Sequence, residues 1–472
     1  MKRRIFAAAL LAFAVPVLLL AAAQASKPAL SVSDQFERAG AGQEIAGSGN
    51  FPHETAIYGE ALPYTYPPLF DVFGAEAALM AGLDFALVWR ALSFVLLAII
   101  FTYSYKFSHS FLDRNFALCA AALAALLPWV FRRTAAAIPE SVGLAMFVML
   151  LYYVHKKNFL ALAVLMPLLM LTHLRSFGTF AMIFLGVIAY WLFLRTWEIE
   201  EQRERVELMR KIALTFLPTL LLGAWWFLPK LDALSLRGTA NPWVDVFDLT
   251  AMFSWLWAVA LLPAAVLLWK NPKNLPNLVF VFGMVFALVF GGTVFGFREL
   301  AYLFFPIAFL CALLLQWIGG EISANLSLAL FAAFALLLIL QNLAWIQQES
   351  YFSERNLAAV KALDELPYAG ERVLADYMLS YAVPLYTDKK VIIGAFMEGL
   401  PDGSARANAA YGFYTQCLAN RRAVANYYPD IFGFTPYIRN AMHCSGDEFG
   451  GETARWNRIY DNGTTQWHSP AG

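Results

Sequence analysis

The polar stretch Ser31-Val-Ser-Asp-Gln-Phe-Glu-Arg38 follows the first long apolar segment of the chain and precedes many more such segments. Of the 472 residues, 60% are hydrophobic and only 14% are charged. Soluble domains carry about 25% charged residues, so most of this chain must face lipid or the inside of a helix bundle. The sequence therefore predicts a polytopic α-helical membrane protein, with Asp34 placed just outside the first span.

Apolar runs that approach the length of a membrane span recur along the first 346 residues. A helix of about 20 apolar residues crosses the hydrocarbon core of a bilayer. Eleven runs fit this pattern: 5–24, 85–105, 115–131, 139–154, 158–173, 176–194, 212–229, 250–269, 275–293, 298–318 and 323–346. The stretch 67–83 is shorter and carries Asp71 and Glu76, so we expect a juxtamembrane or re-entrant helix there, within a first outer loop at 25–84.

Basic residues set the orientation of these spans. With the amino terminus inside, each cytosolic segment carries at least two Lys or Arg residues, as the positive-inside rule requires. These segments are 1–4, 106–114, 155–157, 195–211 and 270–273. The start also resembles a secretory signal, with Ala23-Gln24-Ala25 as a cleavage site, but its apolar run exceeds the roughly 7–15 residues of a signal. We expect the segment to be retained, and Asp34 lies outside in either case.

Residues 347–472 have a different character from the apolar part. Short alternating runs begin at Arg372 and Lys389, and a helical pattern covers 353–366. Asn462-Gly463 is a strong hairpin signal, although Asn462 also fits a glycosylation acceptor. With eleven spans this segment lies outside, so the sequence predicts a small C-terminal extracytoplasmic α/β domain.

The four cysteines divide between the two parts of the chain. Cys119 and Cys311 lie in apolar segments and are expected to be inert core residues. Cys417 and Cys444 lie in the C-terminal segment, and spacing alone leaves open whether they form a disulfide.

Charge and motif content exclude two classes of partner. The 34 basic and 34 acidic residues cancel, which argues against binding to nucleic acid. No glycine-rich fingerprint follows a predicted strand, so a nucleotide-sugar donor is not supported.

Short polar motifs recur at the predicted outer ends of the apolar segments. They are Ser33-Asp34-Gln35-Phe36, Tyr64-Thr-Tyr-Pro-Pro-Leu-Phe70, Arg90, Arg132-Arg133 with Ile138-Pro139-Glu140, Thr172-His173 and Phe297-Arg298-Glu299. In order and sidedness they resemble the GT-C superfamily of membrane glycosyltransferases, which includes protein O-mannosyltransferases, aminoarabinose transferases and the catalytic subunits of oligosaccharyltransferases. The resemblance covers roughly residues 1–320.

The chain departs from this superfamily at two places. Many members have an Asp-Glu pair where this chain has Asp34-Gln35, and Trp225-Trp226 is followed by Phe227 instead of the aspartate of oligosaccharyltransferases. The second difference argues against transfer to asparagine and leaves the acceptor open among glycans, lipids and proteins.

The resemblance implies a sugar donor joined to a polyprenyl phosphate and presented from the membrane. The departing phosphate is a weak base, so it needs no general acid, unlike the leaving group of a glycosidase. The enzyme then needs a base for the proton of the acceptor and cations for the departing charge. The resemblance makes Asp34 the base, and Glu140 either orients the acceptor or shares a divalent cation such as Mg²⁺ or Mn²⁺ with Asp34.

The predicted contacts to the donor phosphate are mainly arginines, whose planar fork matches phosphate oxygens. Arg298 and Arg175 are the main candidates, with His173 as a further donor. The resemblance adds three other predicted substrate contacts: Arg132, Arg133 and Tyr66.

Each candidate also has a purely structural interpretation. Asp34 with Glu37 has the spacing of a capping box, and Glu140 is a first-turn acid that the helix dipole favours. Arg132, Arg133 and Arg175 fit interfacial side chains that reach for water. Arg298 fits an ion pair with Glu299, and His173 fits a packed histidine.

Two other function classes compete with the enzyme hypothesis. A transporter or lipid flippase typically shows repeated halves and ionisable groups near the midplane, and the midspan positions here are almost free of them. A non-catalytic envelope-assembly protein is the other alternative, because the C-terminal segment fits a binding module.

Overall fold

The computed structural model describes a large part of the chain and divides it into two compact units. The described residues are 2–27, 30, 33–49, 54–55, 62–63, 66–83, 85–189, 202–230, 252–260, 297–348, 352–365, 372–374, 377–391, 431–434, 456–461 and 466–470. Unit 1 comprises Met1–Ser26, Trp89–Trp226 and Thr239–Gln348. Unit 2 comprises Lys27–Val88, Phe227–Gly238 and Glu349–Gly472.

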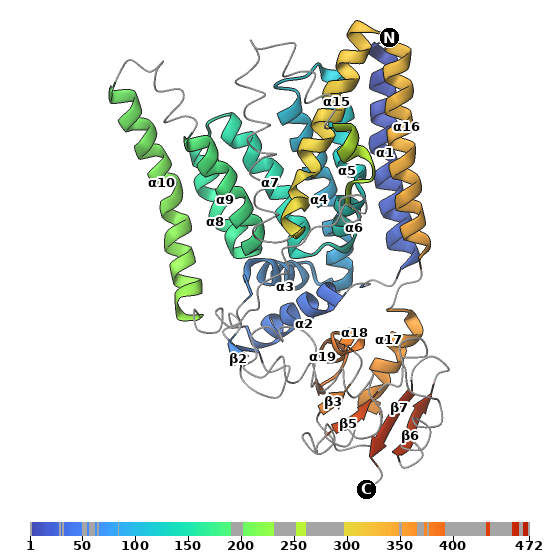
Figure 1. Ribbon diagram of the computed structural model, residues 1–472. Helices are drawn as coiled ribbons and strands as arrows, with labels where there is room; N and C mark the ends of the chain where they lie inside the picture. Colours follow the sequence, from blue (N-terminus) through green and yellow to red (C-terminus); the bar gives the residue numbers. More distant parts are fainter. Residues whose placement is uncertain are drawn as a thin grey trace. The chain divides into compact units, whose positions relative to one another are not determined.

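Unit 1 is a bundle of helices (Figure 1). Its helices, two of which extend a few residues into unit 2, are α1 (Lys2–Ser26), α4 (Phe85–Ser108), α5 (Arg114–Leu126), α6 (Pro128–Ala136), α7 (Pro139–His155), α8 (Phe159–Thr172), α9 (Leu174–Ala189), α10 (Gln202–Phe227), η4 (Phe297–Leu303), α15 (Phe304–Glu321) and α16 (Ala324–Gln347).

Several of these helices suit a membrane. By length and composition, four spans within the described residues are long and apolar enough to cross one: Leu87–Ser108, Val206–Lys230, Leu300–Glu321 and Ala324–Gln347. The chain is a multi-pass membrane protein, as the composition predicts. The count of eleven spans stays a prediction, because residues 261–296 lie outside the described part.

The span predicted at 115–131 is formed by two helices, α5 and α6, which together are long and apolar enough to cross a membrane. The chain bends by 62° between α5 and α6. Leu127 has extended backbone angles and Pro128 begins α6, where its missing N–H costs nothing. The break leaves the carbonyl of Leu126 at the end of α5, and the Asn342 side chain of α16 donates a 2.8 Å hydrogen bond to it.

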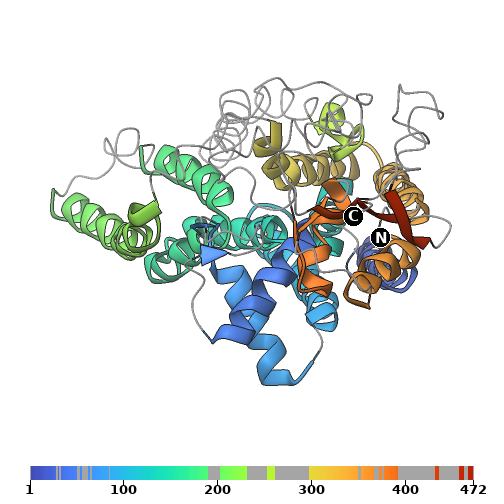
Figure 2. The ribbon, with the colours of Figure 1, turned by 90° about the horizontal axis from the view of Figure 1, so that it is seen from below.

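Small side chains let α5 pack at the centre of unit 1. Residues 116–126 are all buried, and most of them are alanines. Small residues allow helix backbones to approach closely in a membrane, and α5 contacts α1, α15 and α16. Cys119 of α5 and Cys311 of α15 are buried free thiols, as predicted. The two views show α1 in blue lying along α16 in orange (Figure 1, Figure 2).

Unit 2 begins with two helices from the first predicted outer loop. They are α2 (Ser33–Ser48) and α3 (Leu69–Ala81), and the short strands β1 (Glu54–Thr55) and β2 (Leu62–Pro63) pair antiparallel between them. The helix expected near 67–83 is present as α3, which ends at Gly82 in a left-handed conformation that glycine adopts without strain.

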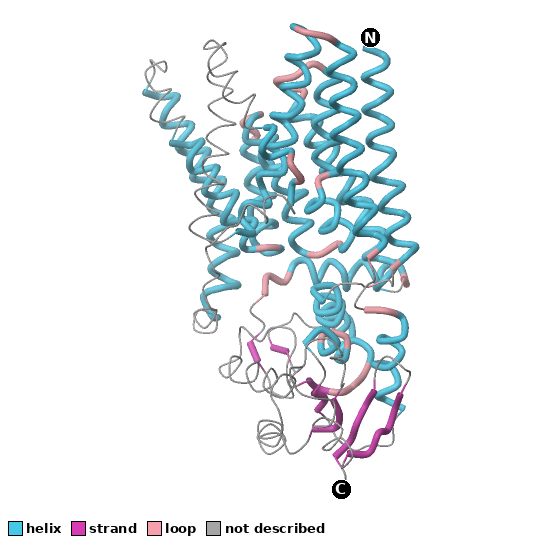
Figure 3. The backbone as a smooth tube through the Cα atoms, turned by 45° about the vertical axis from the view of Figure 1, so that its right-hand side comes forward, coloured by secondary structure: helices cyan, strands magenta, loops and turns pink. Residues whose placement is uncertain are grey.

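The C-terminal segment supplies the rest of unit 2. It contains α17 (Glu354–Lys361), η5 (Ala362–Glu365), β3 (Arg372–Leu374), α18 (Tyr377–Ser380), α19 (Val383–Tyr386), β4 (Lys390–Val391), β5 (Ile431–Phe434), β6 (Trp456–Asp461) and β7 (Gln466–Pro470). The strands, drawn in magenta in Figure 3, form one sheet. Their order is β4-β3-β5-β7-β6, and β3 runs parallel to β4 and β5.

The hairpin predicted around Asn462-Gly463 is confirmed, since β6 and β7 pair antiparallel with Asp461 opposite Gln466. Cys417 and Cys444 lie outside the described residues. The sidedness of this segment and the predicted domain boundary at 346–347 stay predictions.

Aromatic contacts join the first loop to the C-terminal segment inside unit 2. The ring of Phe36 on α2 lies 4.3 Å from that of Phe352 and 6.1 Å from that of Tyr386, centroid to centroid. Phe36 is fully buried. The helix that carries Asp34 is therefore held by residues more than 300 positions further along the chain.

Candidate functional site

Glu140 is a buried acid at the start of α7. Ala137 has a left-handed backbone and Ile138 an extended one, and Pro139 then opens the helix. Glu140 thus falls in the first turn, where the helix dipole favours a negative charge. Only 8% of the residue is exposed.

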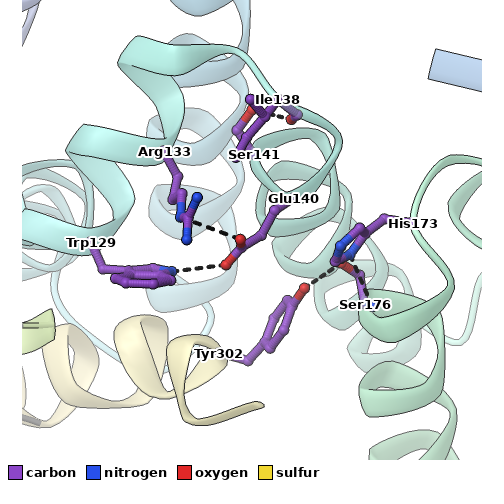
Figure 4. Close-up of polar contacts among 8 residues, drawn as sticks. All are labelled: Trp129, Arg133, Ile138, Glu140, Ser141, His173, Ser176 and Tyr302. Carbon is purple, nitrogen blue, oxygen red and sulfur yellow. Dashed lines mark hydrogen bonds and ion pairs between the residues drawn. The ribbon is translucent and has the colours of Figure 1, made fainter. Parts of the chain in front are cut away.

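Two side chains of α6 hold the Glu140 carboxylate (Figure 4). Trp129 Nε1 donates to Oε1 at 2.9 Å, and Arg133 Nε lies 3.3 Å from Oε2. The guanidinium of Arg133 also lies over the Trp129 ring, 4.3 Å from its centroid. Both carboxylate oxygens are therefore engaged, which suits a group that orients a ligand.

The two adjacent arginines of α6 differ in their surroundings. Arg133 serves Glu140, whereas the buried Nε of Arg132 has no hydrogen-bond partner among the described residues. The structure thus brings Arg133 and Glu140 together and leaves Arg132 with a donor available for a ligand.

A hydrogen-bonded chain links His173, Ser176 and Tyr302 (Figure 4). His173 Nδ1 contacts Ser176 Oγ, which in turn contacts the Tyr302 hydroxyl. Ser176 and Tyr302 are absent from the sequence-based candidates. They lie 126 positions apart, so nothing in the local pattern connects them.

The other predicted phosphate contacts lie near this chain in the fold. Arg175 is half-buried in the first turn of α9. The backbone of Arg298 is part of η4, which contacts α9. The side chain of Arg298 lies outside the described part of the structure. The two arginines are therefore on neighbouring elements of unit 1.

Unit 2 holds a second charged cluster, centred on Arg38 of α2. Arg38 Nη1 lies 2.8 Å from Asp71 Oδ2 of α3, and Nη2 pairs with Glu37. The guanidinium carbon lies 3.8 Å from the centroid of the Tyr66 ring. Burial raises the pKa of the Tyr66 hydroxyl, and its ring acts here as a platform for Arg38. The predicted role of Tyr66 toward substrate stays a prediction.

Asp34 lies in the first turn of α2, because that helix begins at Ser33. Glu37 follows one turn later. Burial raises the pKa of the Glu37 carboxyl to about 7, Arg38 opposes this shift, and the negative charge of Asp34 adds to it. Glu37 is therefore a carboxyl that titrates near neutral pH. Sequence reasoning saw Glu37 only as a capping partner of Asp34.

The described residues offer no built metal site. Among them, no group of three or more His, Cys, Asp or Glu side chains is placed to hold a metal ion. Trp129 and Arg133 each contact one oxygen of Glu140, and a divalent cation shared by Glu140 and Asp34 stays a prediction.

The fold of this chain is similar to the solved structures of an oligosaccharyltransferase and of ArnT. The apo oligosaccharyltransferase from Archaeoglobus fulgidus matches with a TM-score of 0.64 at 11% identity, over 90% of this chain and 69% of that chain. Apo ArnT from Cupriavidus metallidurans matches with a TM-score of 0.63 at 13% identity, over 98% of this chain and 97% of that chain. The chain has the fold of the GT-C glycosyltransferases.

Other matches and searches complete this comparison. ArnT from the same organism, bound to undecaprenyl phosphate, matches with a TM-score of 0.61 at 14% identity, again over 98% and 97% of the two chains. No protein-family model matches the sequence, and no curated protein does. At these identities the likeness establishes the GT-C fold and leaves the activity to be argued from the residues.

Proposed function

We propose that the chain is a glycosyltransferase that moves a sugar from a polyprenyl-phosphate donor to an acceptor on the extracytoplasmic face of the membrane. The observation that carries this proposal is the likeness to ArnT over nearly the whole of both chains, including a structure bound to undecaprenyl phosphate. An archaeal oligosaccharyltransferase of the same fold is complexed with a dolichol-phosphate and an inhibitory peptide.

The reaction needs one proton acceptor and a site for one departing negative charge. Asp34 takes the proton of the acceptor hydroxyl or amine as that atom bonds to the sugar carbon. The bond between this carbon and the phosphate oxygen breaks, and the electron pair leaves with the polyprenyl phosphate.

Cationic side chains then stabilise the departing phosphate. Arg298 and Arg175 supply this charge, and His173 supplies a further hydrogen bond. These residues lie on or next to η4 and α9, which contact each other in unit 1. Arg132 adds a donor from α6.

Glu140 orients the acceptor in this proposal. Its fixed carboxylate can receive a hydrogen bond from a hydroxyl or amine, because each oxygen has more than one lone pair. Trp129 and Arg133 keep the carboxylate in place. No step of the proposal uses a divalent cation.

Transfer from labelled donors tests this function directly. The purified full chain, in lipid nanodiscs, is given polyprenyl-phosphate sugars labelled in the sugar, with and without an extract that contains acceptors. We expect label to move to an acceptor while polyprenyl phosphate is released. Movement of intact donor between leaflets in proteoliposomes, with no cleavage of any donor, would instead support the flippase alternative.

A further inference from the structure

The His173–Ser176–Tyr302 chain joins three elements of unit 1 at a buried point. His173 follows α8, Ser176 lies in the first turn of α9, and Tyr302 lies near the end of η4. Ser176 is fully buried and Tyr302 is 1% exposed. A buried hydroxyl that loses its partner costs free energy, so each member of this chain holds the next in place.

The direction of the hydrogen bonds follows from the backbone. The N–H of Ser176 can only donate, and it lies 3.2 Å from His173 Nδ1. Nδ1 is therefore the acceptor, the Ser176 hydroxyl donates to it, and the Tyr302 hydroxyl donates to Ser176 Oγ. The tyrosine is thus connected to His173 through the Ser176 hydroxyl.

Helix α7 closes over this chain at a glycine. A Cβ atom on residue 143 would lie 2.0 Å from Ser176 Oγ, so only glycine permits the approach. One turn further on, the Phe147 ring lies 4.9 Å from that of Tyr302, centroid to centroid. Glu140 stands three residues before Gly143 on the same helix. The hydrogen-bonded residues Ser176 and Tyr302 therefore pack against α7, the helix that carries Glu140.

The element that Tyr302 anchors needs outside support. η4 is a 3₁₀ helix of seven residues, and runs of this geometry longer than about four residues are uncommon because their hydrogen bonds are poor. Its contacts with α9 and the Tyr302 hydroxyl supply such support. Arg298 lies four residues before Tyr302 in the same element.

We propose that Ser176 and Tyr302 are positioning residues that fix η4 against α9 and α7 and so hold Arg298 at the donor phosphate. The proposal rests on the proposed function for the role of Arg298. It predicts that losing the Tyr302 hydroxyl weakens donor binding while the chemical step, once the donor is bound, proceeds at nearly the same rate.

Tyr302→Phe is the principal variant, because it removes the hydroxyl and keeps the ring against Phe147. Ser176→Ala breaks the same chain at its centre and serves as the second variant. Ser327→Ala is the matched control. Ser327 lies on α16, is also a buried hydroxyl of unit 1, and donates a 2.7 Å hydrogen bond to the carbonyl of Leu315.

The first measurements need no enzymatic activity. Hydrogen–deuterium exchange of the 297–303 amides and the affinity for undecaprenyl phosphate are measured on the purified full chain. We expect Tyr302→Phe and Ser176→Ala to speed exchange in this segment and to weaken lipid phosphate binding about tenfold, the size of one net hydrogen bond. The Ser327→Ala control is expected to match wild type in both. If Tyr302→Phe and Ser176→Ala also match wild type in both measurements, the proposal is wrong.

The second measurement connects Tyr302 to Arg298. Donor KM and kcat are compared for Tyr302→Phe, Arg298→Lys and the double variant. Lysine cannot reproduce the planar fork of arginine, so Arg298→Lys should raise the donor KM. Tyr302→Phe should then raise it little further, with kcat within about twofold of the single variant. Fully additive effects would overturn the link to Arg298. Absence of any transfer by wild type, with the exchange and affinity changes intact, would overturn the proposed function and leave the anchoring of η4 standing.

Discussion

Arg38 and Asp71 form a buried ion pair that joins α2 to α3, with Nη1 2.8 Å from Oδ2. The Arg38 side chain is 2% exposed and that of Asp71 is fully buried. Removing one partner of such a pair leaves an uncompensated charge in the interior. The placement of α2, and with it of Asp34, therefore depends on Arg38.

Arg38→Ala is expected to destabilise unit 2 by about 3–5 kcal/mol, the usual cost of breaking a buried pair. Chemical unfolding followed by tryptophan fluorescence would measure this loss. Gln43→Ala, on an exposed position of the same helix, is the control and should change stability by less than about 0.5 kcal/mol. Equal midpoints for the two variants would contradict the structural role of the pair.

Glu37 is expected to make stability fall as the pH rises toward neutral. Its pKa is about 7 in the folded chain and about 4.3 in an unfolded one. Between these values the folded state binds the proton and the unfolded state does not, so the free energy of unfolding decreases with rising pH and levels off above about 7.

The test compares wild type with Glu37→Gln, which cannot ionise. Unfolding midpoints at pH 5 and pH 8 should differ more for wild type than for the variant. The same pH dependence in both proteins would show that Glu37 does not titrate in this range.

Glu140→Gln is expected to lower kcat/KM for the acceptor about 10- to 100-fold, because hydrogen bonds to a charged group exceed those to a neutral amide. The donor KM should stay within about twofold of wild type, since the donor contacts are assigned to other residues. Trp129→Phe keeps a ring beneath Arg133 and removes one hydrogen bond to Glu140. It should therefore also lower kcat/KM for the acceptor, but by less than Glu140→Gln does. A change in the donor KM alone, with kcat/KM for the acceptor unchanged, would refute the role assigned to Glu140.

The sidedness of the C-terminal segment is open to cysteine labelling. Asp388 is exposed in unit 2, and we expect an Asp388→Cys residue to react with a membrane-impermeant maleimide in intact cells. Cys417→Ser and Cys444→Ser in the same protein remove the other cysteines of this segment. Labelling only after the membrane is permeabilised would show that the C-terminal segment lies inside, which would contradict the predicted topology.

Local patterns in the sequence predict most helices in the described part of the chain, because each apolar run or turn signal acts within its own segment. The break at Leu127-Pro128 had a local signal, a proline within an apolar run, but a run of this composition also fits one straight span. The antiparallel pairing of β6 and β7 is likewise predicted from a local signal, Asn462-Gly463.

The site contacts depend on residues far apart in the chain, so no local pattern reveals them. Arg38 meets Asp71 across 33 positions, and Ser176 meets Tyr302 across 126. Glu140 with Arg133 is the exception, because the turn at Ala137 brings the ends of α6 and α7 together within a few residues.

Asp34 is the residue on which the catalytic proposal depends most. Asp34→Asn keeps the size and polarity of the side chain, and asparagine caps a helix nearly as well as aspartate. It cannot take a proton from the acceptor. Donor binding should survive, because the phosphate contacts are assigned to arginines.

The decisive measurement is the turnover of Asp34→Asn at saturating labelled donor, beside its affinity for that donor. We expect a folded, membrane-inserted protein with near wild-type donor affinity and a rate reduced about 10²- to 10⁴-fold, the usual cost of losing a general base. Turnover close to wild type would contradict the assignment and leave Asp34 as a first-turn residue of α2.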